Sequence, residues 1–130
     1  MNEVLLVEYC RELGISLSAG QIKQFSRYFE ELLAWNQKFN LTAITDEQGV
    51  HIKHFVDSLL GSQTTDWQGS GSLLDLGTGA GFPGLPLKIV CPDLEVTLVD
   101  SLLKRVGFLK HMIEVLGLKG VRAIHARAED

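Results

Sequence analysis

The chain has 130 residues, of which 45% are hydrophobic and 22% charged, with a formal net charge of −4. These values are typical of a single globular domain and argue against non-specific nucleic-acid binding by the whole surface, although a local basic patch is still possible. No segment approaches the about 18 consecutive apolar residues of a membrane span, and the amino terminus lacks the basic start and cleavage site of a signal peptide.

The two cysteines, Cys10 and Cys91, are far apart and match no metal or redox spacing. They are interpreted as free thiols of a reducing compartment, which predicts a cytoplasmic protein.

Hydrophobic spacing predicts three helices in the first half of the chain. The first is closed by Gly14, and the second is opened by a capping box in which Ser18 is the N-cap and Gln21 reaches back. A connector is expected from Asn36 to Thr45, and a third helix is expected to start near Asp46. The apolar positions of these helices are Val4, Leu5, Tyr9 and Leu13, then Ile22, Phe25, Phe29, Leu32 and Leu33, then Ile52, Phe55, Val56, Leu59 and Leu60.

The second half alternates short apolar runs with helical segments. Strands are predicted at 72–76, at 96–99 ending on Asp100, and at 121–126, with helices at 84–90 and 101–116. This order favours an α/β fold with a parallel sheet, whose ligands bind beyond the carboxyl ends of the strands. The predicted organisation is a helical extension at 1–61, a linker at 62–72, and the first half of a ligand-binding domain at 73–130.

The first predicted strand ends in the segment Asp75-Leu76-Gly77-Thr78-Gly79-Ala80-Gly81-Phe82-Pro83-Gly84. Part of it also matches the dinucleotide pattern G-x-G-x-x-G, which is weak by itself. That match starts two residues late, however, and Pro83 and Pro86 remove donors that a pyrophosphate would need. The acid before the first glycine points instead to S-adenosylmethionine (SAM), a cationic sulfonium, with Gly77, Thr78 and Gly79 at the ligand.

Acidic residues follow the other two strands. Asp100 is placed to accept hydrogen bonds from ribose hydroxyls, and it or Ser101 could also cap the next helix. After the third strand, an acid within 127–130 could accept from the adenine amine, or the cluster could be solvated.

Other candidates are weaker. His51 and His54 lie one turn apart, but two ligands do not make a metal site, so no metal is predicted. Lys104, Arg105 and Lys110 could contact phosphate or form a solvated helix face, and Lys53 is a further basic candidate for contact with RNA. Trp35 and Phe39 are interpreted as packing residues rather than base-stacking platforms.

Taken together, several motifs resemble the bacterial 16S ribosomal RNA guanine-N7 methyltransferases, also called the glucose-inhibited division protein B family. They are Trp35-Asn36-x-x-Phe39-Asn40-Leu41-Thr42, His54-Phe55-x-Asp57-Ser58-Leu59, the stretch from Leu74 to Leu87 that contains Phe82-Pro83-Gly84-Leu85-Pro86, Leu98-Val99-Asp100-Ser101-x-x-Lys104-Arg105, and Arg127-Ala128-Glu129.

The resemblance implies a Rossmann-like SAM-dependent methyltransferase fold, with helices on both faces of the sheet and a helical amino-terminal extension. It implies SAM contacts at Gly77, Phe82, Ala128 and Glu129, with Asp100 near the ribose. The family's sheet has strands beyond the three found here, so the carboxyl-terminal strands, including one that carries Ser-Arg-Ala beside the first strand, are expected outside this chain.

The implied substrate is a guanine in 16S ribosomal RNA, free or in the small subunit, and the full-length protein is expected to be a monomer without membrane contact. Guanine N7 has a lone pair and no proton at neutral pH, so alignment is sufficient and no catalytic residue is assigned. Two alternatives stay open: a nicotinamide-dependent oxidoreductase, and a non-catalytic SAM- or RNA-binding module formed by the truncated chain.

Overall fold

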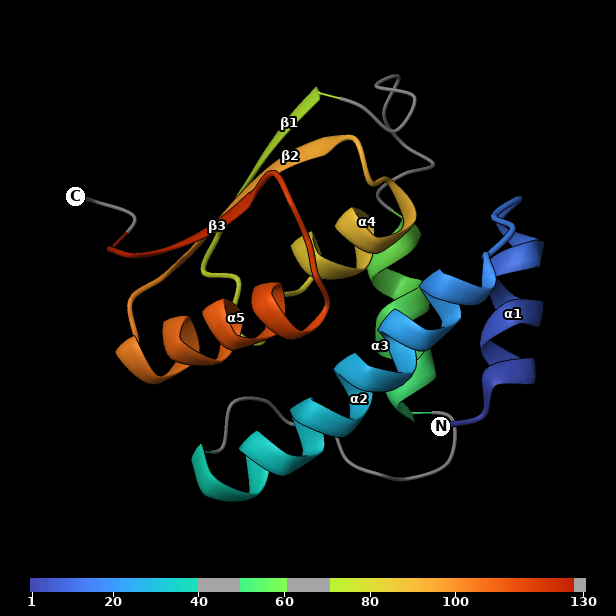
Figure 1. Ribbon diagram of the computed structural model, residues 1–130, viewed down its shortest axis with the longest axis horizontal. Coiled ribbons are helices and arrows are strands. Elements are labelled where there is room, and N and C mark those ends of the chain that lie inside the picture. Colours follow the sequence, from blue (N-terminus) through green and yellow to red (C-terminus); the bar gives the residue numbers. More distant parts are fainter. Residues whose placement is uncertain (40–49, 61–70, 128–130) are drawn as a thin grey trace.

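The computed structural model describes residues 1–39, 50–60 and 71–127 and shows a parallel sheet packed against helices (Figure 1). The elements are α1 (Glu3–Glu12), α2 (Ala19–Phe39), α3 (Val50–Leu59), β1 (Gly71–Leu76), α4 (Gly84–Val90), β2 (Leu94–Asp100), α5 (Leu103–Val115) and β3 (Val121–His125). The predicted order of helices and strands is confirmed. No helix among the described residues has the length and apolar character needed to cross a membrane.

Side-chain caps open the first two helices. The Asn2 side chain accepts from the Leu5 N–H at 3.0 Å and caps α1. The predicted capping box of α2 is confirmed, because Ser18 Oγ accepts from the Gln21 N–H at 3.1 Å and Gln21 Oε1 accepts from the Ser18 N–H at 2.8 Å. Each cap satisfies a donor that the first turn of a helix leaves free.

Helix α2 is longer than the sequence predicts. The connector expected from Asn36 is wrong for residues 36–39, which are helical. The added turn lets the Phe39 ring lie 5.5 Å from Trp35, whose own ring lies 5.6 Å from Phe108 of α5. Trp35 therefore packs as predicted. The rest of the connector, the predicted start of α3 near Asp46 and most of the predicted linker fall outside the described residues.

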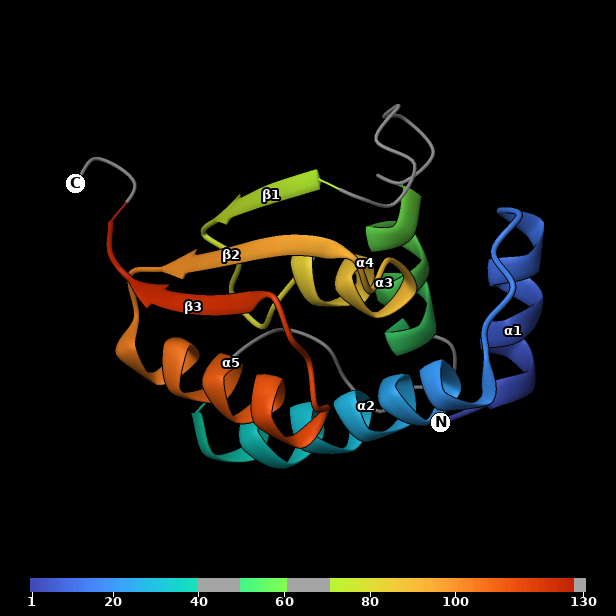
Figure 2. The same ribbon diagram turned by 45° about the horizontal axis from the view of Figure 1, so that its top comes forward.

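The sheet has the order β1-β2-β3, and both pairs of strands are parallel. Strand β2 begins two residues earlier than predicted, at Leu94, and β3 ends at His125. Helices α4 and α5 cover the same face, where Leu94, Val96 and Leu98 are buried. Figure 2 shows the strands as one layer, with α5 below them and α2 beyond α5. The carboxyl ends of all three strands therefore meet at one edge.

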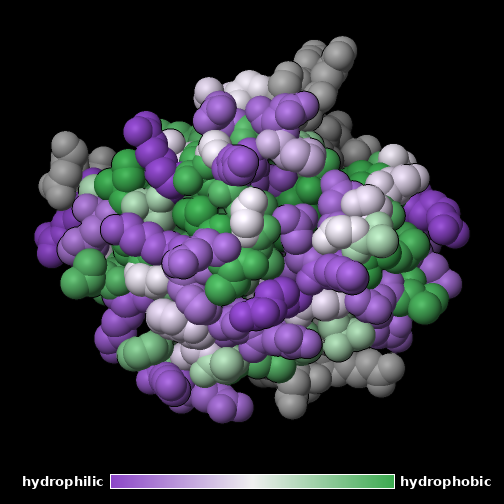
Figure 3. Space-filling view, viewed as in Figure 1, coloured by the Kyte–Doolittle hydropathy of each residue, from purple (hydrophilic) through white to green (hydrophobic). Residues whose placement is uncertain are grey.

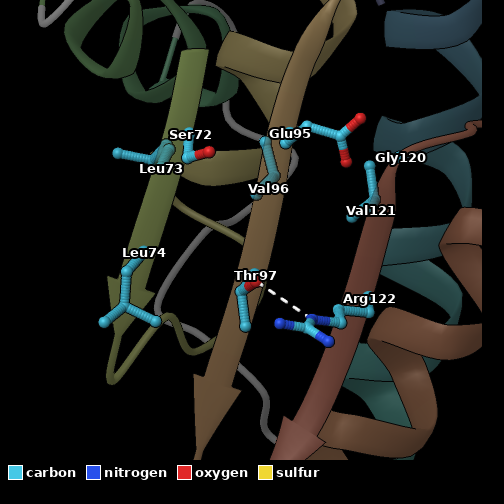
Figure 4. Close-up of a pocket in the computed structure, with 9 residues that line it drawn as sticks. All are labelled: Ser72, Leu73, Leu74, Glu95, Val96, Thr97, Gly120, Val121 and Arg122. Carbon is cyan, nitrogen blue, oxygen red and sulfur yellow. Dashed lines mark hydrogen bonds between the residues drawn. The ribbon is translucent and has the colours of Figure 1, made fainter.

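The second face of the sheet, on which helices were also expected, carries exposed apolar side chains in the described part of the chain. Leu74 and Leu76 of edge strand β1 are 60% and 52% exposed, and Ile124 of β3 is 38% exposed. A hollow of about 650 Å³ lies over the amino-terminal halves of the strands, where Arg122 reaches across to Thr97 at 3.2 Å (Figure 4). From the side of Figure 1, hydrophobic residues surface in several separate places between hydrophilic ones (Figure 3).

One hydrophobic core joins the helical segment to the sheet. Phe25, Leu32 and Phe55 belong to the same buried cluster as Leu98 and Phe108. Side chains of α2 also satisfy carbonyls where two other helices end. Gln21 Nε2 donates to the Ile89 carbonyl in the last turn of α4, and Gln24 Nε2 donates to the Leu116 carbonyl that follows α5, each at 3.0 Å.

A charged cluster adds a further link between α2 and α5. Glu31 lies 2.9 Å from both Arg27 and His111. Burial acts to raise the pKa of Glu31, but the hydrogen bonds and charges of His111 and Arg27 outweigh it, so the pKa lies below its ordinary value of 4.5. A carboxyl whose pKa is lowered by folding contributes stability above its unfolded pKa, and this contribution is lost as the pH falls through the folded pKa.

We expect Glu31→Gln to lower the free energy of unfolding at pH 7 by about 0.5–1.5 kcal/mol, the range for a hydrogen-bonded charge near the surface. The difference from the parent should shrink as the pH falls toward about 3. Urea unfolding at both pH values measures it, with the exposed neighbour Glu30→Gln as control. An equal loss of stability at both pH values would show that the charge of Glu31 does not account for its contribution to stability.

Candidate functional site

The loop after β1 remains beside β2. The N–H groups of Gly77 and Thr78 both donate to the Val99 carbonyl, at 2.8 and 3.1 Å. The loop thus begins at the carboxyl edge of the sheet, where parallel α/β folds bind ligands. The 650 Å³ hollow lies toward the other end of the strands, so it is not part of this site.

Asp75 forms hydrogen bonds near both ends of the loop. Its Oδ2 accepts from the Thr78 hydroxyl at 2.7 Å and from the Gly84 N–H at 3.0 Å. Desolvation by burial raises the pKa of Asp75, hydrogen bonds from Thr78 and Gly84 oppose the rise, and the nearby charge of Asp100 adds to it. The acid that marked this motif in the sequence therefore has a clear role in shaping the loop.

Asp100 joins the loop to the start of α5. Its Oδ2 accepts from the Gly79 N–H at 2.8 Å, its Oδ1 accepts from the Leu102 N–H at 2.9 Å, and Arg105 Nη1 lies 3.6 Å from Oδ1. The prediction that Asp100 or Ser101 caps α5 is wrong, because Leu102 occupies the N-cap position without a side-chain cap bond. The carboxylate binds the glycine loop through one oxygen and the N–H of the N-cap residue through the other. Its contact with a ribose stays a prediction.

Two glycines leave open space at the turn of the loop. Gly77 and Gly79 have φ values of +66° and +62°, and a Cβ at either position would meet no atom within 4 Å. The positive φ explains why glycine is preferred there. The open space means that a ligand could approach the backbone directly, next to the carboxylate of Asp100.

The start of α4 does not suit a pyrophosphate. The Gly84 N–H is taken by Asp75, the Leu85 N–H donates to the Gly81 carbonyl at 2.7 Å, and Pro83 and Pro86 have no N–H. A dinucleotide site needs such donors for its phosphates. Two neighbouring carboxylates also favour a cationic ligand over an anionic one.

Aromatic residues of the helical segment support the loop from the side of the core. The Tyr28 hydroxyl donates to the Ala80 carbonyl, and its ring stacks on Phe82 with centroids 5.7 Å apart. Phe55 and His54 of α3 lie 5.9 and 6.1 Å from the Phe82 ring. Tyr28 is not among the residues predicted for the site, although its spacing from Phe25 places it on the buried face of α2, where a hydroxyl requires a partner.

The structure brings Gly77, Thr78, Gly79, Phe82 and Asp100 together at one edge of the sheet. Their contact with a cofactor stays a prediction. Ala128 and Glu129 lie outside the described residues. The chain that leads to them is fixed beside Asp100, because the Ala126 N–H donates to the Asp100 carbonyl at 3.1 Å.

The remaining candidates are scattered. The side chain of His51 is not among those described, and His54 is exposed. Within the described ranges no three His, Cys, Asp or Glu side chains are grouped as a metal site would require. Lys53 and Lys110 are exposed, and Lys104 Nζ lies 6.0 Å from the centroid of the Phe39 ring.

Comparisons with known proteins agree with this geometry. The family profile GidB, described as rRNA small subunit methyltransferase G, matches residues 21–130. Two relatives are named ribosomal RNA small subunit methyltransferase G. The one from Halalkalibacterium halodurans is 55% identical over 91% of this chain and 50% of its own length. The one from Lysinibacillus sphaericus is 50% identical over 100% of this chain and 55% of its own length. The relative from Staphylococcus carnosus is 51% identical over 96% of this chain and 52% of its own length. The chain thus spans about half the length of these curated relatives.

A substitution at Gly84 tests the close packing between the end of the loop, Asp75 and Leu98. A Cβ there would collide with Leu98 Cδ2 and lie 2.9 Å from Asp75 Oδ2, so Gly84→Ala should lower the free energy of unfolding by about 1–3 kcal/mol, as overpacking does. Gly107→Ala is the matched control, since a Cβ in that exposed part of α5 meets nothing within 4 Å. It should leave stability unchanged or raise it by up to about 1 kcal/mol. If urea unfolding showed that both substitutions change the free energy of unfolding equally, the tight packing around Gly84 would be contradicted.

Proposed function

Because the chain belongs to the rRNA small subunit methyltransferase G family, we propose that the protein containing it is a SAM-dependent methyltransferase. Its proposed product is N7-methylguanine in 16S ribosomal RNA. The observation that carries the proposal is the loop between β1 and α4. This loop has open space over Gly77 and Gly79, and the donors that an anionic cofactor would need are already used.

The residues at this loop fit SAM in charge and shape. Gly77, Thr78 and Gly79 would let the ligand approach the backbone, Phe82 would form an apolar wall, and Asp100 would accept from the ribose. Ala128 and Glu129 would border the adenine. The carboxylates at the edge of the sheet would favour the positive charges of the ligand.

The chemistry needs alignment more than proton transfer. SAM supplies an activated methyl group, and guanine N7 already carries a free lone pair. Holding donor and acceptor in line can lower the barrier by up to about 7–11 kcal/mol in favourable cases. For this reason we assign no acid, base or metal ion in this chain to catalysis.

The RNA would be held by local basic side chains. Lys53, Lys104 and Lys110 are on the helices, and Arg105 lies beside Asp100. With a net charge of −4, few phosphate contacts are available from this half, and binding should depend only weakly on salt. We propose that further RNA contacts come from the other half of the full-length protein.

Edge strand β1 would be covered in the full-length protein. Leu74 and Leu76 are exposed, and soluble proteins avoid a long apolar sheet edge. A further strand pairing with β1 would cover this edge, and we propose that the full-length protein is a monomer of the cytoplasm. The isolated half would associate and lack activity.

The direct test is transfer of a tritiated methyl group from SAM to small-subunit RNA by the full-length gene product. We expect label at N7 of a single guanine, and we expect SAM but not NADH to bind in calorimetry. Tight NADH binding would favour the oxidoreductase. The same assay on residues 1–130 tests the non-catalytic module, which SAM or RNA binding by that half without any methyl transfer would favour.

Gly79→Ala tests the role of the loop. The change imposes strain at φ +62° and places a methyl group in the proposed ligand space, so SAM binding should weaken at least about tenfold. Gly117→Ala is the matched control: Gly117 has φ +64° and equally open surroundings, but it lies after α5, remote in sequence from the loop. Both variants should lose similar stability, and only Gly79→Ala should lose SAM. Unchanged SAM affinity in Gly79→Ala would refute the assignment of this loop.

A further inference from the structure

Tyr28 is the point at which helix α2 reaches the glycine loop. Its side chain is fully buried, and its hydroxyl donates to the backbone carbonyl of Ala80. Asp75 and Asp100 hold Thr78, Gly79 and Gly84 from the sheet side. The middle of the loop is therefore held from the opposite side, by a residue of the helical segment.

The hydrogen bond of Tyr28 fixes the orientation of one peptide group. The Gly81 N–H donates to the Thr78 carbonyl at 3.1 Å, while the carbonyl of the same peptide unit, on Ala80, accepts from Tyr28. Gly81 has φ +101°, and a glycine at this position would permit the peptide to rotate. Because both polar ends of the peptide are bonded, the rotation is opposed from two directions.

The ring of Tyr28 fixes a side chain of the same loop. It is stacked on Phe82 at an interplanar angle of 24°, and the Phe55 ring lies 5.3 Å from Tyr28 and 5.9 Å from Phe82. A Cβ at Gly81 would lie 2.9 Å from the Tyr28 oxygen, so the loop and the ring are in close contact. Tyr28 thus constrains both the backbone and an aromatic side chain of the loop to which the proposed function assigns the ligand.

We propose that Tyr28 is a positioning residue for the cofactor loop, through which helix α2 sets the shape of the SAM site. The inference rests on the proposed function for the identity of the ligand. The contacts that carry it are independent of that identity. The helical segment is then a functional part of the cofactor site.

The test is Tyr28→Phe in the full-length gene product, which removes the hydroxyl and keeps the stacked ring. Hydrogen exchange at the Gly81 and Phe82 amides should become about five- to tenfold faster relative to the amides of β2, and the Kd for SAM should rise by a similar factor. Phe108→Leu is the control: it disturbs a fully buried ring that contacts Trp35. It should lower global stability without a selective change in the loop or in the Kd.

The outcomes separate the two proposals. Unchanged loop exchange, or an unchanged Kd in Tyr28→Phe, would overturn the positioning role, as would an equal effect of Phe108→Leu on the Kd. If the parent binds no SAM, the proposed function fails, and the exchange at Gly81 and Phe82 still decides whether Tyr28 holds the loop.

Discussion

The site depends on a carboxylate that is mostly removed from water. Burial of an ionised group is unfavourable unless hydrogen bonds compensate it, and Asp75 is only 8% exposed. The Thr78 hydroxyl and the Gly84 N–H supply that compensation at a single oxygen. Since these donors lie near the two ends of the loop, the carboxylate closes the loop onto strand β1. The positions of Gly79 and Phe82, which lie between the donors, follow from this closure.

A second carboxylate extends the same arrangement to the neighbouring strand. Asp100 binds the loop through Gly79 and binds the approach to α5 through Leu102, with Arg105 as a partial counter-charge. The charge of Asp100 also acts to raise the pKa of Asp75, after the larger effect of burial. Two carboxylates thus lie at the carboxyl edge of the sheet, where the N–H groups of Gly79 and Gly84 are already bonded to them. This arrangement is the basis on which we propose a cationic rather than a pyrophosphate ligand.

Local signals predicted most of the fold, and contacts between distant residues account for what was missed. The capping box at Ser18 involves residues three apart, and glycines and apolar runs placed the strands to within about two residues. The extended end of α2 places Phe39 beside Trp35, whose ring also lies against Phe108 of α5, and this long-range contact is not visible in any local pattern. The same holds for Tyr28 and the Ala80 carbonyl, and for the turn of Asp100 toward Gly79. The resemblance supplied Ala128 and Glu129, and their roles stay predictions.

Along one side of helix α2, four polar side chains each contact a different partner. Gln21 and Gln24 bind the ends of α4 and α5, Tyr28 binds the loop, and Glu31 binds His111. Their spacing of three, four and three residues puts them on one stripe of the helix. A slide of α2 along its axis would break all four contacts together, whereas a small tilt about the stripe could preserve them. The four contacts therefore fix the axial register of helix α2 against α4, the loop and α5 at the same time.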